Sequence, residues 1–424
     1  MAKHVFTGFG FGPIQSGLFL KEAFESGNFD RFVVAEVDQK LVDALRANNG
    51  TYYINIAKAD GVEVVQIDNV ELFNPNVAQD KKALLEALAR STEITTSLPS
   101  VKFYDMGGDT CVASLIAHGV NNSKTDATII YAAENNNHAA EILEKAVEPK
   151  LNIGPGKEVR FLNTVIGKMS QVVTDPDQVE SLNLKPIAPG IDRAFLVEEF
   201  NKILVTRAAI DRFTPGIEVF MEKDDLLPFE EAKLYGHNAI HALLAYLGHV
   251  KGYGKMSELK ADDTLMKIAA KAFIDESGTA LIGKYGKLGD ELFTVTGFQG
   301  YADDLLERMT NTYLTDAIAR TGRDPVRKLG TTDRIFGTMS LTLKYGVTPT
   351  NMALGAIAGI AFLLAQPEEN DLPEELRFSD WKKMTDSDIE KIIKWIWQGQ
   401  STKFNDELIE LVKNAKPSLA NIIE

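Results

Sequence analysis

Cysteine and long hydrophobic runs are nearly absent from this 424-residue sequence. Its one cysteine, Cys111, excludes an intramolecular disulfide and any cysteine-rich zinc or iron–sulfur site. The longest apolar run, residues 352–365, is shorter than the roughly 20 residues that cross a bilayer, so we expect a buried helix there and no membrane contact. No group of His, Cys, Asp and Glu has metal-ligand spacing, which predicts no metal site. The first residues lack a signal-peptide pattern, so we expect a cytoplasmic protein.

Positive charge is in the minority, with 45 Lys and Arg residues against 60 Asp and Glu residues and a net charge of −15. This balance argues against nucleic acid or an anionic membrane as the main partner. The composition, 45% hydrophobic and 25% charged, is that of a globular protein with a sizeable core. At about 150 residues per domain, the length predicts two or three domains. The sequence does not indicate an oligomeric state.

The first half of the chain alternates β-branched runs with helical patterns, which predicts a parallel sheet covered by helices on both faces. The expected strands are residues 4–10, 32–38, 62–67, 127–134 and 158–167, and the expected helices are residues 41–49, 80–91 and 138–147. From residue 196 helical patterns dominate, at residues 199–210, 228–250, 264–277, 299–321, 331–346, 352–366, 388–398 and 406–413. Asp386 or Ser387 is the expected N-cap of the helix at 388–398. We therefore predict an α/β domain over residues 1–195 and an all-α domain over residues 196–424.

Glycines follow the first expected strand in the segment GFGFGPIQSG, residues 8–17, ahead of a helical pattern. Backbone N–H groups in such a loop, together with the helix N-terminus, bind a pyrophosphate. The spacing departs from the usual fingerprint because Pro13 stands where the third glycine belongs, so a purely structural turn is the alternative. We assign dinucleotide binding to the loop backbone of Gly8, Gly10, Phe11 and Gly12.

Two acidic residues end the second expected strand, roughly 20 to 30 residues after the glycines, where a carboxylate binds the adenosine ribose hydroxyls. Asp38 also fits the N-cap of the next helix, so Glu36 is the ribose candidate. A carboxylate at this point repels a 2′-phosphate, which favours NAD over NADP. The strand, the glycine loop and the acid together predict a Rossmann-type NAD-binding domain over residues 1–195.

Polar side chains gather on one side of the expected helix at 228–250. On an α-helical wheel His237, Glu230 and His241 lie within about 80° of Lys233, and Asn238 lies about 140° away. A desolvated lysine loses affinity for its proton, so it can act as a general base in the oxidation of a secondary alcohol. Asn and His side chains can donate hydrogen bonds to the developing oxyanion. A solvated helix face is the alternative interpretation.

The segment KLYGHNAIHALLAYLG, residues 233–248, resembles the signature of the polyol-specific long-chain dehydrogenases, the mannitol dehydrogenase family. The shared pattern is a lysine, four residues, an asparagine, two residues and a histidine, followed by a helical AYLG. The resemblance implies that Lys233 is the general base and that Asn238 and His241 bind and polarise the reacting oxygen. Glu230 matches a family glutamate implicated in proton exchange with solvent. His237 has no counterpart in the signature and is left out.

Two segments of the N-terminal half share the resemblance. AAENNNHAAEIL, residues 132–143, is similar to the strand end that carries an acid and an asparagine in the family, which implies that Asn135 is a second amide at the oxyanion. TEITTSLPS, residues 92–100, resembles the Thr-Thr turn that contacts the cofactor, which places Thr96 near the nicotinamide ribose or the pyrophosphate.

The segment GRDPVRKLGTTDRIFG, residues 322–337, is similar to a stretch found in the mannitol-1-phosphate 5-dehydrogenase branch of the family. Its cations suit a substrate phosphate, although ion pairs with local acids are the alternative. The candidates for the substrate phosphate are Arg327, Lys328 and Arg334. The resemblance implies NAD-dependent interconversion of D-mannitol 1-phosphate and D-fructose 6-phosphate, without a metal.

The chain departs from the family where members read Asn-x-Val-Val-Asp-Arg. Asn163 is kept, but Gly167 and Lys168 replace the usual Asp and Arg that help shape the substrate end of the site. A dehydrogenase or reductase of free polyols or hexuronates therefore stays open. So does a sensor protein that binds NAD(H) without catalysis.

Overall fold

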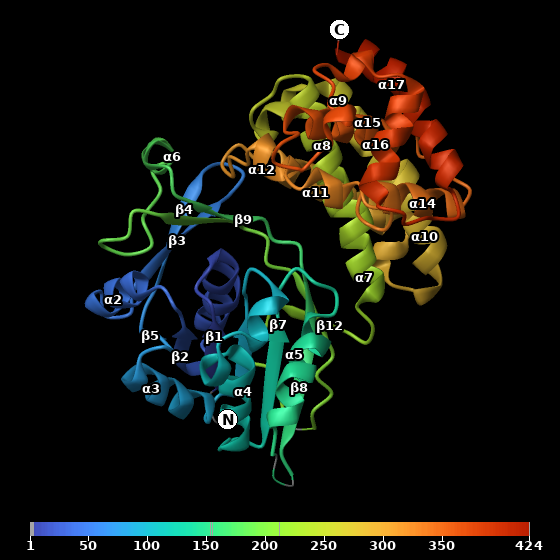
Figure 1. Cartoon of the computed structure of the whole chain (residues 1–424). Coiled ribbons are helices and arrows are strands. Elements are labelled where there is room, and N and C mark those ends of the chain that lie inside the picture. The colour runs from blue at the N-terminus through green and yellow to red at the C-terminus, as the bar shows by residue number, and fades with distance from the viewer. Residues whose placement is uncertain (1–3, 153, 155, 212, 424) are drawn as a thin grey trace. The chain divides into compact units, whose positions relative to one another are not determined.

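The computed structural model describes residues 4–152, 154, 156–211 and 213–423. Its contacts divide the chain into two compact units, Met1–Leu227 and Pro228–Glu424. The first unit carries the strands of both sheets, and the second is built from helices (Figure 1). An α/β unit followed by an all-helical unit is the fold class that the sequence predicts. Among the described residues no helix is both long enough and apolar enough to cross a membrane.

The main sheet of the first unit has eight strands, and its centre has Rossmann-type order (Figure 1). In spatial order the strands are β12 (Phe220–Lys223), β11 (Ile203–Thr206), β8 (Glu158–Ile166), β7 (Ala127–Ala132), β6 (Glu93–Thr96), β1 (His4–Phe9), β2 (Phe29–Ala35) and β5 (Val70–Phe73). All neighbouring pairs are parallel except β8 and β11. The order of the strands reverses between β1 and β6, so ligands are expected outside the carboxyl ends of these two strands.

A second, four-stranded sheet contains β4 (Val62–Ile67), β3 (Tyr52–Ala57), β10 (Ala194–Glu198) and β9 (Ser170–Val173), in that spatial order. The expectation that residues 62–67 join the parallel sheet is therefore wrong. The connection between β3 and β4 is short, so the chain reverses its direction there and β4 pairs with β3 as an antiparallel neighbour.

Side chains alternate between the two faces of the main sheet, and each face has its own core. On β2, Phe32 and Val34 belong to one core, together with the second sheet, and Val33 belongs to the other. The first core also contains side chains of three helices: the π-helix η1 (Gln15–Leu20), α1 (Lys21–Ser26), which follows it directly, and α2 (Gln39–Ala47). The second core is covered by α3 (Ala78–Leu88), α4 (Val112–Asn121) and α5 (Ala139–Val147). A short α6 (Pro176–Ser181) follows β9.

The second unit consists of helices around an apolar centre. Its longest buried element is α15 (Thr350–Ala365), which packs on α8 (Ala239–Val250) and α17 (Asn405–Ile423). The remaining helices include α7 (Leu227–Ala232), η5 (Lys233–Asn238), α9 (Asp263–Lys271), η7 (Ala272–Gly278), α10 (Thr279–Tyr285), α11 (Val295–Met309), α12 (Ile318–Gly322), α13 (Pro325–Lys328), α14 (Phe336–Lys344) and α16 (Asp386–Trp397).

Four further sequence-based expectations differ from the structure. Residues 199–210, expected as a helix, contain β11, because the β-branched run ILVT pairs with β8 and β12. Strands β10, β11 and β12 therefore keep residues 194–223 in the first unit, whereas we expected the boundary after residue 195. The expected helix at 299–321 is two helices, α11 and α12, separated by residues 310–317. The N-cap of α16 is Thr385, which forms a capping box with Asp388.

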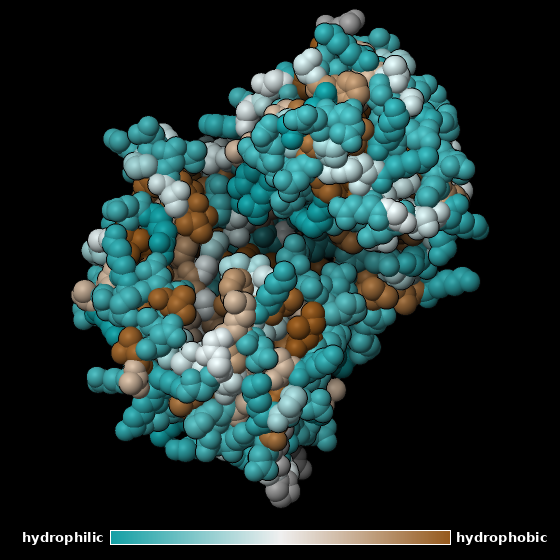
Figure 2. Space-filling view, viewed as in Figure 1, coloured by the Kyte–Doolittle hydropathy of each residue, from teal (hydrophilic) through white to brown (hydrophobic). Residues whose placement is uncertain are grey.

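Figure 2 shows how hydrophobic and hydrophilic residues are distributed over one face of the molecule. On the face drawn in Figure 2, hydrophobic residues form separate small groups within a hydrophilic surround. This distribution matches a chain in which a quarter of the residues are charged.

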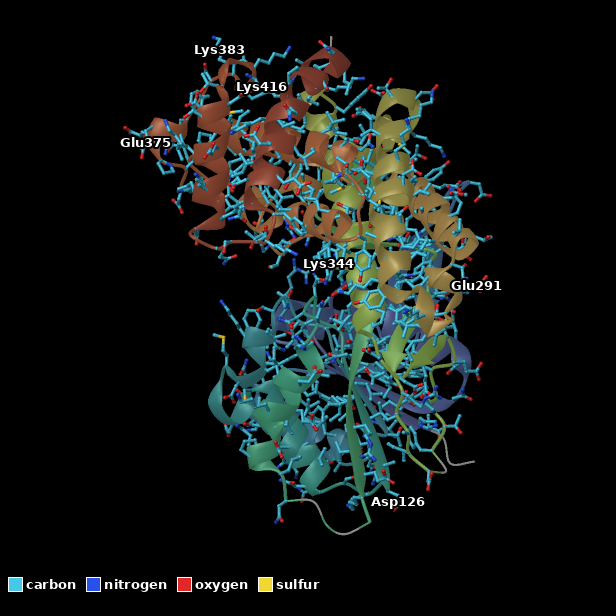
Figure 3. All side chains as sticks on the ribbon, turned by 90° about the vertical axis from the view of Figure 1, so that its right-hand side faces the viewer. Asp126, Glu291, Lys344, Glu375, Lys383 and Lys416 are labelled. Carbon is cyan, nitrogen blue, oxygen red and sulfur yellow. The ribbon has the colours of Figure 1, made fainter. Side chains whose placement is uncertain are left out.

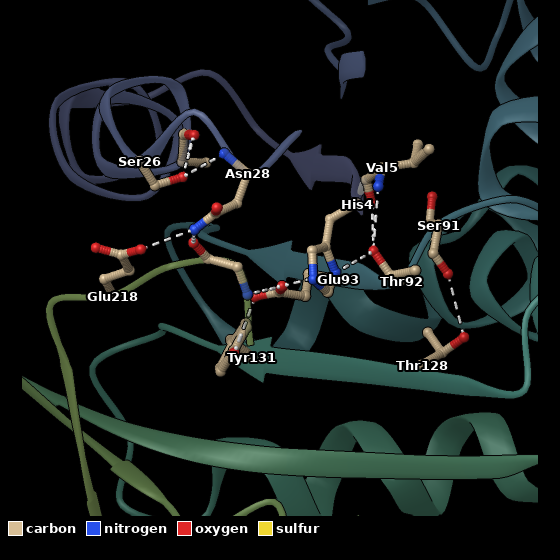
Figure 4. Close-up of polar contacts among 12 residues, drawn as sticks. His4, Val5, Ser26, Asn28, Ser91, Thr92, Glu93, Thr128, Tyr131 and Glu218 are labelled. Carbon is tan, nitrogen blue, oxygen red and sulfur yellow. Dashed lines mark hydrogen bonds and ion pairs between the residues drawn. The ribbon is translucent and has the colours of Figure 1, made fainter. Parts of the chain in front are cut away.

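A buried carboxylate lies at the amino end of the parallel strands (Figure 4). Glu93, the first residue of β6, is fully buried and accepts hydrogen bonds from the Gly216 N–H at 2.6 Å and the Tyr131 hydroxyl at 3.1 Å. His4 Nδ1 lies 3.4 Å from the same carboxylate. Burial raises the pKa of Glu93 to about 7, although these hydrogen bonds act in the opposite direction. Glu93 therefore fastens the chain at Gly216 to the sheet while its charged form remains poorly solvated.

We expect Glu93→Gln to remove a pH-dependent loss of stability. A carboxyl group with a raised folded-state pKa binds more protons when folded, so the free energy of unfolding falls as the pH rises from 4.5 to about 7. A shift of this size corresponds to roughly 3 kcal/mol. Glutamine keeps an oxygen that accepts from Gly216, so urea unfolding between about pH 5 and pH 7.5 should lose this slope. The exposed Glu144→Gln is the matched control, and an unchanged slope in Glu93→Gln would contradict the assignment.

Candidate active site

The glycine loop lies at the carboxyl end of β1, where the strand order reverses. Gly10 has a positive φ of 82°, and a Cβ there would lie 2.9 Å from the backbone oxygen of Ser97. A Cβ at Gly8 would collide with the side chain of Gln15, whereas one at Gly12 would meet nothing within 4 Å. Gly8 and Gly10 thus permit close packing, and Gly12 leaves open space beside the backbone.

Pro13 does not break the loop but begins the helix that follows it. Helical residues run from Pro13 to Ser26, and the Ser16 N–H donates to the Gly12 oxygen at 2.9 Å. Proline is well suited to the first turn of a helix, where its missing N–H costs nothing. The helix N-terminus therefore lies directly after Gly12, the position at which an anion is bound in dinucleotide-binding folds.

Glu36 follows β2 and connects its end to the glycine loop. Its Oε2 accepts from the Phe11 N–H at 2.8 Å, and its Oε1 accepts from the N–H groups of Val37 and Asp38 at 2.7 and 2.9 Å. The Phe11 ring is buried and packs edge-on against Tyr52. Glu36 thereby holds the loop at its carboxyl edge, and the predicted role of Asp38 as the N-cap of α2 is confirmed by its hydrogen bond from Leu41 N–H.

Thr96 ends β6, the strand beside β1, and Asn135 follows β7, the next strand along the sheet. Thr96 is fully buried and donates its hydroxyl proton to Glu134 at 2.9 Å, so its side chain is engaged within the protein. Glu134 also accepts from Leu98 N–H and the Tyr104 hydroxyl, and burial raises its pKa. Asn135, the neighbour of Glu134 after β7, is exposed. The structure thus brings Gly8–Gly12, Glu36, Thr96 and Asn135 to one edge of the sheet.

The residues that depart from the family pattern have local contacts. Lys168 is buried, and its Nζ donates to the backbone oxygens of Glu198 and Phe200. Asn163 accepts from Ala140 N–H at 2.9 Å. Lys168 therefore holds the chain after β10, a task inside the first unit that does not require contact with a substrate.

The predicted catalytic segment of the second unit is a π-helical turn rather than a regular α-helix. Lys233 begins η5 and Asn238 ends it. A π turn closes its backbone hydrogen bonds between residues i and i+5, so Lys233 and Asn238 lie closer to one face than the roughly 140° separation of a regular α-helical wheel. Such single turns are frequent at functional sites. His237 is buried within η5, and His241 lies in the first turn of α8.

Lys233 has an unusually acidic ammonium group. Burial, together with the positive charge of Arg334, lowers its pKa to about 8, while Glu230 acts in the opposite direction. Glu230 is itself buried on the preceding turn of helix. A substantial fraction of Lys233 is therefore neutral near pH 8, the state that a general base requires.

His241 is a neutral, mostly buried imidazole. Burial lowers its pKa to about 4, although the charge of Asp316 raises it. Its Nε2 is buried and has no hydrogen-bond partner among the residues that the structure describes, with Asp316 Oδ2 3.9 Å away. A buried polar atom of this kind is costly unless a ligand group pairs with it. The His237 and His241 ring centroids lie 6.1 Å apart, and burial also lowers the pKa of His237.

The three phosphate candidates have contacts within the second unit. Arg327 is exposed and pairs with Asp324 and Asp333 at 3.6 and 3.4 Å. Arg334 is mostly buried and pairs with Asp333 at 2.9 Å. Lys328 is buried and donates to the Thr321 oxygen, and burial lowers its pKa to about 7. Arg327 and Arg334 thus form the local ion pairs that are the alternative to a phosphate site, whereas Lys328 binds a backbone oxygen. The charges of Arg334 and Lys328 also act on His241.

Sequence reasoning missed several charged residues of this cluster. Asp316 is buried, accepts from Arg320 and faces His241, while Arg308 acts on the pKa of His237. They lie on α11, α12 and the segment between them, where we expected one continuous helix. That error hid them, because the break at residues 310–317 sets the position of Asp316. In the described part of the chain, no three His, Cys, Asp or Glu side chains form a group that could hold a metal ion.

Comparison with known proteins identifies the family of this chain. Residues 225–419 match the family description Mannitol dehydrogenase C-terminal domain. Mannitol-1-phosphate 5-dehydrogenase from Thermoanaerobacter pseudethanolicus is 30% identical over 357 residues, covering 84% of both chains. The chain belongs to the mannitol dehydrogenase family. The resemblance expected from the sequence and the expected enzyme class, a polyol dehydrogenase, are thereby confirmed. The enzyme of the same name from Lactiplantibacillus plantarum is 28% identical and covers 96% of both chains.

Solved structures agree on the fold of this family member. A D-sorbitol dehydrogenase in substrate-free form superimposes with a TM-score of 0.75 at 15% identity, covering 100% of this chain and 95% of that one. Mannitol 2-dehydrogenase from Pseudomonas fluorescens, solved as a ternary complex with NAD and D-mannitol, gives a TM-score of 0.68 at 16% identity and covers 100% and 94%. The predicted combination of a Rossmann-type domain with a helical domain is confirmed.

We expect Arg334→Gln to raise the pKa of Lys233, because it removes a nearby positive charge and leaves the Asp333 carboxylate unbalanced. NMR titration of isotope-labelled lysine side chains measures this pKa directly, with Lys233→Gln identifying the signal. The parent should titrate near 8 and the variant at higher pH. A parent midpoint at the ordinary lysine value of 10.5 would contradict the desolvation argument.

Proposed function

We propose that this mannitol dehydrogenase family member is an NAD-dependent enzyme that interconverts D-mannitol 1-phosphate and D-fructose 6-phosphate, with Lys233 as general base. The observation that carries the proposal is the desolvated Lys233 amine on a π turn, in the same polar cluster as a buried His241 nitrogen that has no described partner. The substrate assignment is supported by two relatives named mannitol-1-phosphate 5-dehydrogenase, which match 84% and 96% of the chain.

The residues at the carboxyl edge of the main sheet fit a dinucleotide. The open space at Gly12, the helix N-terminus that follows it and the tight turn at Gly10 suit a pyrophosphate. Glu36 would hold the ribose hydroxyls with a carboxylate that already fixes the loop. Bound there, NAD supplies the hydride acceptor for the substrate carbon. A carboxylate at this position repels a 2′-phosphate, which favours NAD over NADP.

The base in the proposed mechanism is Lys233. Its neutral amine takes the proton of the substrate hydroxyl group as that carbon is oxidised, and the ammonium form returns the proton when the ketone is reduced. Desolvation makes both forms accessible near pH 8. Glu230, buried one turn before Lys233, passes the proton between the amine and solvent.

Hydrogen bonds to the reacting oxygen come from side chains that stay neutral. Asn135 and Asn238 donate from their amides, and neutral His241 orients the substrate through Nε2. Neutral donors stabilise the developing alkoxide without trapping it, because none of them carries a full charge. The substrate phosphate is assigned to Arg327, Lys328 and Arg334. Of these, exposed Arg327 is the most accessible to a phosphate.

The presence of Lys168 is the observation that favours alternative substrates. It stands where the family pattern has an arginine, and its contacts with Glu198 and Phe200 are structural. An enzyme for free polyols or hexuronates and a non-catalytic NAD(H) sensor are therefore the competing outcomes of the tests below. A cytoplasmic location and the absence of a nucleic-acid partner remain predictions.

The substrate proposal predicts rapid NADH consumption with D-fructose 6-phosphate and little with D-fructose or D-fructuronate, measured by NADH absorbance in the presence of EDTA. Arg327→Gln should raise KM for fructose 6-phosphate by about tenfold, since one charge-assisted bond to a phosphate is lost. The exposed Lys382→Gln is the matched control and should leave KM unchanged. Preference for an unphosphorylated substrate would overturn the substrate assignment. NADH binding without consumption of any substrate would favour the sensor.

The base proposal predicts that Lys233→Ala lowers kcat by about 10²–10⁴-fold, the range for loss of general acid–base catalysis. NADH binding, followed by quenching of tryptophan fluorescence, should change little. In the parent, polyol oxidation should rise with pH through about 8 as the amine loses its proton, and ketone reduction should fall over the same range. Lys233→Arg keeps the positive charge but cannot deprotonate, so it should be as inactive as Lys233→Ala. Parental kcat in either variant would exclude this mechanism.

A further inference from the structure

A basic hollow of about 790 Å³ lies on the first unit, beside α3 and α4. It is lined by Arg31, Lys81, Lys82, Glu86, Arg90, His118, Asn122 and Lys124, with Ala78, Leu85 and Ala89 as its apolar part. Five lysines and arginines meet a single carboxylate there, although the chain as a whole carries a net charge of −15. Its volume lies within the range of about 300–1,000 Å³ that is usual for small-molecule sites.

Three of these cations lack an acidic partner among the described residues. Arg31 pairs with Glu71 at 2.7 Å, and Lys81 pairs with Asp109. No described carboxylate lies within ion-pair distance of Lys82, Arg90 or Lys124, and all three side chains are exposed in the hollow. Like charges that share a concave surface reinforce one another and concentrate anions there.

Helix ends account for only part of this arrangement. Arg90 and Lys124 follow the C-terminal ends of α3 and α4, where cations complement the helix dipoles. Lys82 lies past the first turn of α3, so the helix dipole does not account for its position beside Arg90 and Lys124 in the hollow.

The hollow is separate from the proposed dinucleotide site. Arg90 precedes β6, Lys124 precedes β7 and Arg31 lies near the start of β2, so they border the amino ends of these parallel strands. The glycine loop and Glu36 lie at the carboxyl ends, the opposite edge of the same sheet. A ligand in the hollow would leave the carboxyl edge free.

We propose that this hollow binds a small phosphorylated molecule with at least two negative charges. Lys82, Arg90 and Lys124 supply the charge, and the exposed His118 and Asn122 add hydrogen-bonding groups. The aliphatic side chain of Leu85 offers a surface for the carbon part of the molecule. This inference is independent of the proposed dehydrogenase function, because it uses none of the residues assigned to catalysis.

The test is calorimetric titration of the full chain with inorganic tripolyphosphate in the presence of saturating NADH, which keeps the probe out of the dinucleotide site. The parent should give a saturable isotherm whose affinity falls with rising salt. A triple variant, Lys82→Gln, Arg90→Gln and Lys124→Gln, should bind at least about tenfold more weakly, because three charge-assisted bonds are lost. ATP titrated in the same way distinguishes a nucleotide, which should bind more tightly than tripolyphosphate, from a bare phosphate chain.

The matched control changes the same amount of charge on the second unit through Lys260→Gln, Lys382→Gln and Lys383→Gln. These three lysines are exposed, and Lys383 is seen to extend from the surface in Figure 3. The control should bind tripolyphosphate like the parent. Single substitutions at Lys82, Arg90 and Lys124 serve if the triple variant fails to fold. Equal affinity in the parent and the hollow variants, or no saturable binding in the parent, would overturn the proposal.

Discussion

Desolvation of charged groups is the constraint that shapes the polar cluster of the second unit. Burial lowers the pKa of Lys233, Lys328 and His241, and the neighbouring positive charge of Arg334 acts on all three in the same direction. The guanidinium groups of Arg334 and Arg320 pair with Asp333 and Asp316. The lowered pKa of Lys233 comes first from burial and second from the charge of Arg334, and it is the property that the proposed role as general base requires.

The π turn is the feature that the sequence could not reveal. The signature spacing identified Lys233, Asn238 and His241 as a set, but an α-helical wheel separated Asn238 from the lysine. The π turn contains one more residue than an α-helical turn, which rotates all later residues about the helix axis. Lys233 and Asn238 therefore lie closer to one face, while the apolar side of α8 still packs in the core. The residue spacing therefore indicated which side chains belong to one set, but it did not indicate how the helix orients them. Only the arrangement of backbone hydrogen bonds distinguishes the two helix types, and no local propensity records it.

Fold prediction succeeded where periodicity and burial agree and failed where pairing partners are distant. The strand at β1, the glycine loop and the helices α2, α3 and α5 follow from local patterns. β11 has an apolar run that suits a helix or a strand equally, and its partners β8 and β12 decided the outcome. The same long-range pairing moved the boundary between the units past residue 195. Within the candidate site, the strand-end and signature residues were chosen from the sequence and their roles stay predictions, whereas the partners of Thr96 and Lys168 required tertiary structure.

The carboxylates of the first unit are held by backbone N–H groups, whereas the arginines of the polar cluster in the second unit are held by ion pairs. Glu36, Glu93 and Glu134 each accept hydrogen bonds from backbone N–H groups and fasten a loop to a strand of the main sheet. Backbone donors carry no net charge, so Glu93 and Glu134 pay a desolvation cost that raises their pKa. Acids thereby join the loops at the two edges of the sheet to its strands, and at Phe11 apolar packing on Tyr52 adds to the contact with Glu36. Part of the chain's excess of acidic residues thus serves the fold of the main sheet.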